Sequence, residues 1–146
     1  MSTEPVGIAA IGTGNWASVL VGALVKSTKL TLRTCFSRNA EKRRSFAEKF
    51  GCENGESYEA VLARGDVEAV VITTPDDTHA DMARQAAQAG KHVITEKPMA
   101  ISVAACREMI DGCAKAGVKL AVAHGHRHSR SLREMKRMLE AGELGQ

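Results

Sequence analysis

Residues 6–17 of the chain read VGIAAIGTGNWA, a short apolar run that passes at once into a glycine turn. The run at 6–11 has the length and composition of a buried parallel strand, and residues 16–25 carry apolar side chains at helical spacing. A strand, a glycine turn and a helix in this order form the local arrangement that holds dinucleotide phosphates. The sequence therefore predicts a phosphate-binding loop at residues 12–17.

The small residues of this loop each suit a phosphate site. Gly12 permits the tight turn, Gly14 lets the backbone approach a pyrophosphate, and Ala17 lets the helix pack close to the strand. The N-terminus of the following helix offers unpaired amides and a positive dipole to the phosphates. The alternative is a glycine turn that only joins two elements.

Apolar runs and periodic segments alternate along the rest of the chain, which is typical of parallel strands joined by crossover helices. Further strands are predicted at 30–36, 69–72, 92–95 and 120–123, and helices at 40–50, after Ser57, after Asp77 or Thr78, after Ser102 and at 131–141. Inward-facing side chains are expected from Cys106, Met109, Ile110 and Cys113, and an apolar side of the last helix from Leu132, Met135 and Leu139. The pattern predicts one doubly wound α/β domain over residues 1–146, a Rossmann fold of about six strands with helices on both faces.

Composition excludes several classes of protein. With 146 residues, of which 44% are hydrophobic and 25% charged, the chain suits one globular domain and not a disordered tail or a fibre. A net charge of +3, no secretory signal pattern at residues 1–5 and no apolar stretch of the ~20 residues that a spanning helix needs predict a cytoplasmic protein without nucleic-acid or membrane partners. The four cysteines form no Cys-x-x-Cys pair, so we expect reduced, mostly buried thiols and no zinc site.

The end of the second strand indicates which dinucleotide binds. Ser37 stands where an NAD-selective protein carries an acid for the ribose hydroxyls. Ser37 and Arg38 could instead hold a 2′-phosphate, with added charge from Lys42 and Arg43. The sequence favours NADP, with NAD possible. The alternative is a solvated helix start with no ligand.

A second signature lies in residues 74–79 (TPDDTH), 89–93 (AGKHV) and 96–98 (EKP). On these motifs the chain resembles the Gfo/Idh/MocA family of NAD(P)-dependent oxidoreductases, and the resemblance extends from Gly12 to Gly145. It implies that Glu96 and Lys97 lie beside the nicotinamide and that Lys97 is the catalytic residue. A lysine ammonium there could bind a substrate hydroxyl and move its proton, especially if partly buried, with Pro98 aiming it through a cis bond. A plain surface cation is the alternative for Lys97.

The resemblance also implies further crevice residues. Thr73, Thr74 and Pro75 would contact the cofactor's ribose, Arg127 would lie near cofactor or substrate, and His79 would mainly anchor the following helix. Asp76 and Asp77 are as suited to capping that helix as to touching a ligand. The expected cofactor-binding residues are Gly12, Thr13, Gly14, Asn15, Trp16, Ser37, Arg38, Thr73, Thr74, Pro75, His79, Glu96, Lys97 and Arg127.

The histidine and arginine residues between 124 and 137 admit other interpretations. His124, His126 and His128 alternate as metal ligands can, but no carboxylates are arranged around them, so no metal is predicted. The basic residues of this segment have no aromatic neighbours for base stacking, which argues against an RNA-binding protein.

The family's members carry a second domain that completes the substrate pocket, and this chain stops at Gln146 before it. We expect the nucleotide-binding domain of an NADP(H)-preferring oxidoreductase that moves hydride between nicotinamide and an alcohol or carbonyl carbon of a sugar, cyclitol, other polyol or dihydrodiol. A homo-oligomer is expected for the full-length protein. The alternative is a stand-alone, non-catalytic NAD(P)-binding sensor or regulatory module.

Overall fold

The computed structural model describes residues 4–145, which build one six-stranded parallel sheet in the order β3-β2-β1-β4-β5-β6. The strands are β1 (Val6–Ile11), β2 (Leu30–Phe36), β3 (Glu53–Asn54), β4 (Ala69–Ile72), β5 (His92–Thr95) and β6 (Leu120–Val122). The order reverses between β1 and β4, and doubly wound sheets bind ligands at the carboxyl ends of the strands on either side of such a point. The predicted fold class is confirmed.

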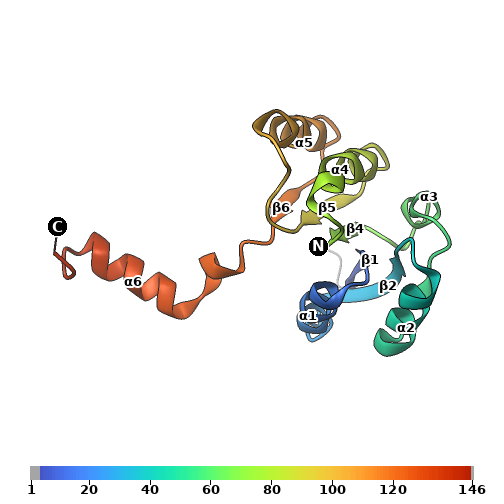
Figure 1. Ribbon diagram of the computed structural model, residues 1–146, viewed down its shortest axis with the longest axis horizontal. Helices are drawn as coiled ribbons and strands as arrows, with labels where there is room; N and C mark the ends of the chain where they lie inside the picture. The colour runs from blue at the N-terminus through green and yellow to red at the C-terminus, as the bar shows by residue number, and fades with distance from the viewer. Residues whose placement is uncertain (1–3, 146) are drawn as a thin grey trace.

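Helices cover both faces of this sheet (Figure 1). They are α1 (Asn15–Leu24), α2 (Ala40–Phe50), α3 (Tyr58–Leu62), α4 (His79–Gln88), α5 (Val103–Lys115) and α6 (Arg130–Glu140), with the 3₁₀ turns η1 (Asp76–Thr78) and η2 (Gly125–His128). Successive strand residues feed two separate cores, because side chains alternate across a strand. Ile8 packs with α1 and α2, whereas Ile11 packs with α3, α4 and α5.

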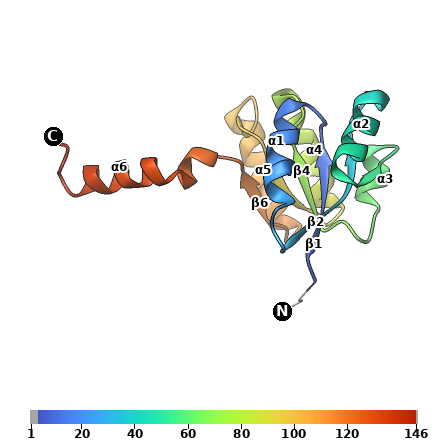
Figure 2. The ribbon, with the colours of Figure 1, turned by 90° about the horizontal axis from the view of Figure 1, so that it is seen from below.

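Helix α6 stands apart from these two layers. Figures 1 and 2 show it leaving the domain after β6 as an extended arm. The predicted amphipathic helix is therefore present, but its apolar residues Leu132, Met135 and Leu139 are exposed. The predicted domain range of 1–146 also includes residues 1–3 and 146, which lie outside the described residues.

Two helix starts follow the predicted caps fully, and a third follows its predicted cap in position only. Ser57 accepts a hydrogen bond from the Ala60 amide, and Ser102 accepts one from the Ala105 amide, as Ser N-caps do. The expectation that Asp77 or Thr78 caps α4 is met in position only: Thr78 is the N-cap residue, but no side-chain cap hydrogen bond forms. Residues 76–78 form the separate turn η1, and the Thr78 hydroxyl donates back to the Pro75 carbonyl at 2.6 Å.

The predicted inward face of α5 is narrower than expected. Met109 and Cys113 are buried and Cys106 is half-buried, but Ile110 is 52% exposed. Ile110 follows Met109 by about 100° around the helix, which turns it away from the stripe that faces α4 and the sheet. Strand β3 has no predicted counterpart, because its two residues are polar and exposed.

Candidate functional site

The turn after β1 requires glycine at position 12. Gly12 has φ +98°, and a Cβ built there would lie 2.7 Å from the Thr73 Oγ1 and 2.9 Å from the Thr73 carbonyl carbon and oxygen. Backbone hydrogen bonds hold both Gly12 and Thr73 in place: the Gly12 amide donates to the Phe36 carbonyl at 2.8 Å, and the Thr73 amide donates to the Ile11 carbonyl at 2.7 Å. The ends of β1, β2 and β4 thus meet at a residue that must lack a side chain.

The N-terminus of α1 is open to an anion. Gly14 is its N-cap and supplies no side-chain cap, and the first turn carries no acidic residue. A Cβ added to Gly14 would meet nothing within 4 Å, so the loop backbone can be approached from outside. The amides of the first turn are then donors without helical acceptors, which suits a pyrophosphate. Ala17 is buried against the sheet, as its small size predicts.

A cavity of about 930 Å³ lies at the carboxyl ends of the strands, within the size range of small-molecule sites. Its lining comes from the glycine loop, the β2–α2 junction, α3, the β4–η1 segment and α4: Gly12, Thr13, Gly14, Phe36, Ser37, Arg38, Asn39, Lys42, Tyr58, Glu59, Thr73, Thr74, Pro75, Asp77, Thr78, Asp81, Met82 and Gln85. A second cavity of about 530 Å³ shares Thr13, Gly14, Asn39 and Lys42 with it and continues between α1 and α2. The glycine loop and the β2–α2 junction therefore line both cavities.

Hydrogen bonds tie the β2–α2 junction to the glycine loop. The Ser37 and Thr13 hydroxyls lie 2.7 Å apart, and the Asn39 side chain caps α2 by accepting from the Lys42 amide at 2.9 Å. Arg43 lines neither cavity. Its guanidinium donates to the Ser37 carbonyl at 2.7 Å and to Asn54 at 2.5 Å, and so holds the junction in shape.

Two cations at this junction remain available to a ligand. Arg38 and Lys42 are exposed and line the larger cavity, and neither side chain has an ion-pair partner among residues 4–145. Because their ends are flexible and hydrated, they can reorient toward an anion at little cost.

His79 joins two loops from inside the protein. Its side chain is 1% exposed, with Nε2 at 2.9 Å from the Thr74 carbonyl oxygen and Nδ1 at 3.0 Å from the Pro98 carbonyl oxygen. Both ring nitrogens therefore face backbone acceptors and not the cavity. This arrangement favours the anchoring role of His79; a direct cofactor contact stays a prediction.

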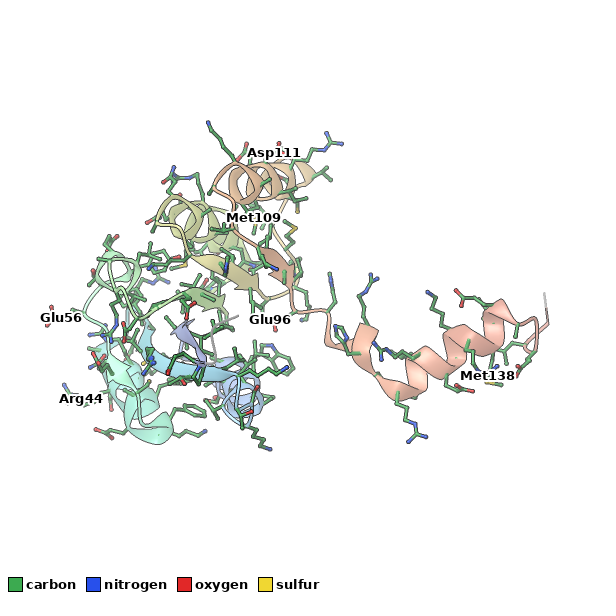
Figure 3. The ribbon with its side chains drawn as sticks, turned by 180° about the vertical axis from the view of Figure 1, so that it is seen from behind. Arg44, Glu56, Glu96, Met109, Asp111 and Met138 are labelled. Carbon is green, nitrogen blue, oxygen red and sulfur yellow. The ribbon has the colours of Figure 1, made fainter. Side chains whose placement is uncertain are left out.

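Glu96 is a buried carboxylate at the end of β5 (Figure 3). Its Oε1 accepts from the Trp16 indole nitrogen at 2.5 Å, and its Oε2 accepts from the Lys97 amide at 3.1 Å. Trp16 belongs to α1, so this bond fastens the first helix to the Glu-Lys-Pro segment. The Lys97–Pro98 peptide bond is cis, as the sequence suggested, but Lys97 is exposed, so the partial burial considered for its ammonium is not found.

The predicted site residues divide into two groups. The larger cavity gathers Gly12, Thr13, Gly14, Ser37, Arg38, Thr73, Thr74 and Pro75, and the smaller one adds Asn15. Trp16, His79, Glu96, Lys97 and Arg127 line neither. Arg127 is exposed in η2, at the base of the α6 arm.

Other lining residues were not predicted, chiefly Phe36, Tyr58, Met82 and Gln85. They come from β2, α3 and α4, and only the tertiary fold brings them together; no local pattern marks them. Burial raises the pKa of the Tyr58 phenol, whose hydroxyl donates to the Met82 carbonyl at 2.7 Å.

Neither a metal cluster nor a membrane-spanning helix is present in the part of the chain that the structure describes. No group of three or more histidine, cysteine, aspartate or glutamate side chains there could hold a metal ion. No helix in it is both long and apolar enough to cross a membrane.

Comparison with known proteins assigns the family. Residues 6–124 match the oxidoreductase family with an NAD-binding Rossmann fold named GFO_IDH_MocA, so the chain belongs to the Gfo/Idh/MocA family. The chain is 33% identical over 147 aligned residues to a dTDP-3,4-didehydro-2,6-dideoxy-α-D-glucose 3-reductase of Streptomyces violaceoruber, covering 98% of this chain and 43% of that protein. A second relative, 30% identical over 136 residues, is named a 1,5-anhydro-D-fructose reductase of Ensifer adhaerens, covering 92% of this chain and 41% of that protein.

Solved structures of the family contain both nicotinamide dinucleotides. The 3-ketoreductase KijD10 of Actinomadura kijaniata, in complex with NADP and TDP-benzene, is 29% identical with a TM-score of 0.90, over 94% of this chain and 43% of that one. The WlbA dehydrogenase of Bordetella pertussis, with NADH and UDP-GlcNAcA, is 28% identical with a TM-score of 0.93, over 100% of this chain and 42% of that one. The chain spans less than half the length of each of these relatives.

Proposed function

We propose that this chain binds NADP(H) in preference to NAD(H) and serves an oxidoreductase that interconverts an alcohol and a carbonyl on a sugar or related polyol. The observation that carries the cofactor preference is the β2–α2 junction, where Ser37, Arg38 and Lys42 line the cavity and no carboxylate follows β2 directly. A 2′-phosphate there would gain a charge-assisted hydrogen bond worth about 1.5–3 kcal/mol, or roughly 10- to 150-fold in affinity.

The residues present fit a dinucleotide. The first turn of α1 offers free amides for the pyrophosphate, and Gly14 leaves the approach open. When bound, the nicotinamide supplies or accepts the hydride. In the proposed reaction Lys97, which follows β5 and lines neither cavity, binds the substrate oxygen and gives or takes its proton. Glu96 fixes the start of this segment by accepting from the Lys97 amide.

A titration tests the cofactor preference. We expect tighter binding of NADPH than of NADH, and Arg38→Ala and Lys42→Ala should weaken NADPH binding while leaving NADH binding nearly unchanged. Arg44→Ala is the matched control, because Arg44 is an exposed cation of α2, the helix that carries Lys42, points away from the domain in Figure 3 and lines neither cavity. Equal or NADH-favoured binding by the wild-type chain would contradict the proposal.

A second experiment tests Lys97 in the natural full-length polypeptide. Lys97→Ala should abolish turnover of a sugar or polyol substrate while NADPH affinity is largely kept, because Lys97 lines neither cavity. Full activity of this variant would show that Lys97 takes no part in the reaction. We also propose that the same polypeptide is a homo-oligomer, which its size in solution would test. We propose that it is cytoplasmic, which cell fractionation would test.

A further inference from the structure

Two free cysteine thiols meet between β2 and the start of β3. Cys35 of β2 pairs in register with Asn54 of β3, and Cys52 comes two residues before Asn54. Residues two apart in an extended chain point to the same side, so Cys52 lies on the side of the sheet that Cys35 faces. Cys35 belongs to the core that contains Phe46 and Ala47 of α2, and Cys52 packs against that core. The two side chains are in hydrogen-bonding contact.

The two thiols differ in accessibility and in acidity. Cys35 is buried, whereas Cys52 is only half-buried, so a dissolved oxidant reaches Cys52 first. The contact with the Cys35 side chain lowers the pKa of the Cys52 thiol, whereas the same contact and burial raise the pKa of the Cys35 thiol. The thiolate is the form that peroxides oxidise. Cys52 therefore suits the thiol that is oxidised first, and Cys35 the thiol that then reacts with it.

Cys35 also helps to hold the β2–α2 junction. Its Sγ donates to the Arg43 carbonyl of α2 at 3.5 Å, and the Arg43 guanidinium donates to the Ser37 carbonyl at 2.7 Å. Phe36 and Ser37, the next two residues after Cys35, line the larger cavity. A disulfide sulfur has no hydrogen to donate, so oxidation of Cys35 would remove its bond to α2. The cysteine pair is thereby connected to the junction at which we propose that the 2′-phosphate binds.

We propose that Cys35 and Cys52 are a peroxide-sensitive pair that closes to an intramolecular disulfide and loosens the β2–α2 junction. First the Cys52 thiolate attacks hydrogen peroxide, the O–O bond breaks, hydroxide leaves, and the sulfur is oxidised to a sulfenic acid. Then the Cys35 sulfur attacks the sulfenic sulfur, the S–O bond breaks, and the hydroxyl group leaves with the Cys35 proton as water. A dithiol reductant reverses the change by thiol–disulfide exchange. Only the effect on NADPH binding rests on the proposed function.

Peptide mapping tests the disulfide. The reduced, folded chain is treated with hydrogen peroxide, its remaining free thiols are alkylated, and it is digested with trypsin without reduction. Because trypsin cuts after lysine and arginine, Cys35 falls in the peptide 34–38 and Cys52 in the peptide 50–64. We expect these two peptides to appear as one cross-linked species that dithiothreitol separates.

A titration with NADPH tests the effect on the junction. Oxidation should weaken NADPH binding about fivefold, which corresponds to the loss of one ordinary hydrogen bond, and dithiothreitol should restore the affinity. Peroxide also oxidises methionine, and Met82 lines the larger cavity. Dithiothreitol does not reduce a methionine sulfoxide under these conditions, so the reversible part of the change belongs to the thiols.

Three variants assign the effect to the pair. Cys52→Ser and Cys35→Ala should give no cross-linked peptide and no change in NADPH affinity that dithiothreitol reverses. Cys106→Ser is the matched control and should behave as the wild type. Cys106 is half-buried like Cys52, but it lies on α5, roughly 10 Å along the helix from Cys113, which is too far for a disulfide.

The outcomes separate this proposal from the proposed function. Absence of the cross-linked peptide, whether Cys52 is oxidised or unmodified, would overturn the disulfide. A cross-linked chain that binds NADPH as tightly as the reduced chain would overturn the effect on the junction. A reduced wild type that binds neither NADPH nor NADH would overturn the proposed function, and the peptide map would still decide the disulfide. Thermal unfolding shows whether each variant is folded, and Cys52→Ser carries the test if Cys35→Ala is not.

Discussion

Replacing Gly12 by alanine should destabilise the domain strongly, for two reasons that can be measured separately. The new Cβ would lie 2.9 Å from the Thr73 carbonyl carbon and oxygen, which are backbone atoms held by the β1–β4 pairing and cannot rotate away. Overpacking of this kind costs about 1–3 kcal/mol. The φ of +98° adds a disfavoured backbone conformation of about 1–3 kcal/mol. The sum, about 2–6 kcal/mol, is a large part of the 5–15 kcal/mol that stabilises a typical domain.

Two other glycines separate these terms. Gly51, the C-cap of α2, has φ +64° but no atom within 4 Å of an added Cβ, so Gly51→Ala should show the backbone cost alone. Gly14 has φ −78° and equally open surroundings. The free energy of unfolding of Gly14→Ala should therefore lie within about 1 kcal/mol of the wild-type value.

Urea unfolding gives the free energy of unfolding of each of the three variants, provided that they share the m-value of the wild type. The expected order of destabilisation is Gly12→Ala, then Gly51→Ala, then Gly14→Ala. If Gly12→Ala were no less stable than Gly51→Ala, the close approach of Thr73 would not be the constraint that the structure indicates. Wild-type stability of Gly51→Ala would refute the argument from φ.

Three further predictions follow from the site. Gly14→Ala should weaken NADPH binding although it leaves stability nearly intact, because its methyl group occupies the proposed pyrophosphate approach; unchanged affinity on titration would place the phosphates elsewhere. Trp16→Phe should lower the free energy of unfolding by about 1.5–3 kcal/mol, because the buried Glu96 carboxylate loses a hydrogen-bond donor. The control is Val19→Ala, at an exposed position on the same helix, which should be nearly neutral in the same urea experiment. The pKa of the Cys52 thiol is lowered, chiefly by its hydrogen-bonding contact with the Cys35 side chain, so alkylation of Cys52 should titrate below the range of an ordinary thiol and shift upward in Cys35→Ala, which peptide mass spectrometry across pH can follow.

The sequence predicts this fold well because its strongest signals are local. Buried parallel strands must be apolar on both faces, so β4 stands out as an unbroken run, and Ser57 marks a helix start by its own side chain. Strand β3 lacks that signal, since it lies at the sheet edge with both side chains exposed. Ile110 was misplaced because helical spacing gives the direction of an apolar face but not its width, which depends on the neighbouring elements.

The site is predicted less completely, for a related reason. Glycines and motif residues can be recognised in the sequence, but a cavity wall built from α3 and α4 exists only after the chain has folded. Arg43 shows the same limit: its position shortly after Arg38 in the sequence suggests a shared ligand, whereas the fold supplies Asn54 and the Ser37 carbonyl as its hydrogen-bond partners.

The structure separates the residues proposed for affinity from those proposed for chemistry. The larger cavity is lined by several elements of this chain, among them Tyr58 of α3, Gln85 of α4 and the β2–α2 junction. Lys97 and Trp16 lie outside it and are exposed, although the buried Glu96 connects both of them through its two carboxylate oxygens. Substitutions around the cavity should therefore act on dinucleotide binding, and substitutions at Lys97 on turnover. The Trp16–Glu96 hydrogen bond joins α1 to the Glu-Lys-Pro segment. A substitution that breaks this bond should therefore change both dinucleotide binding and turnover.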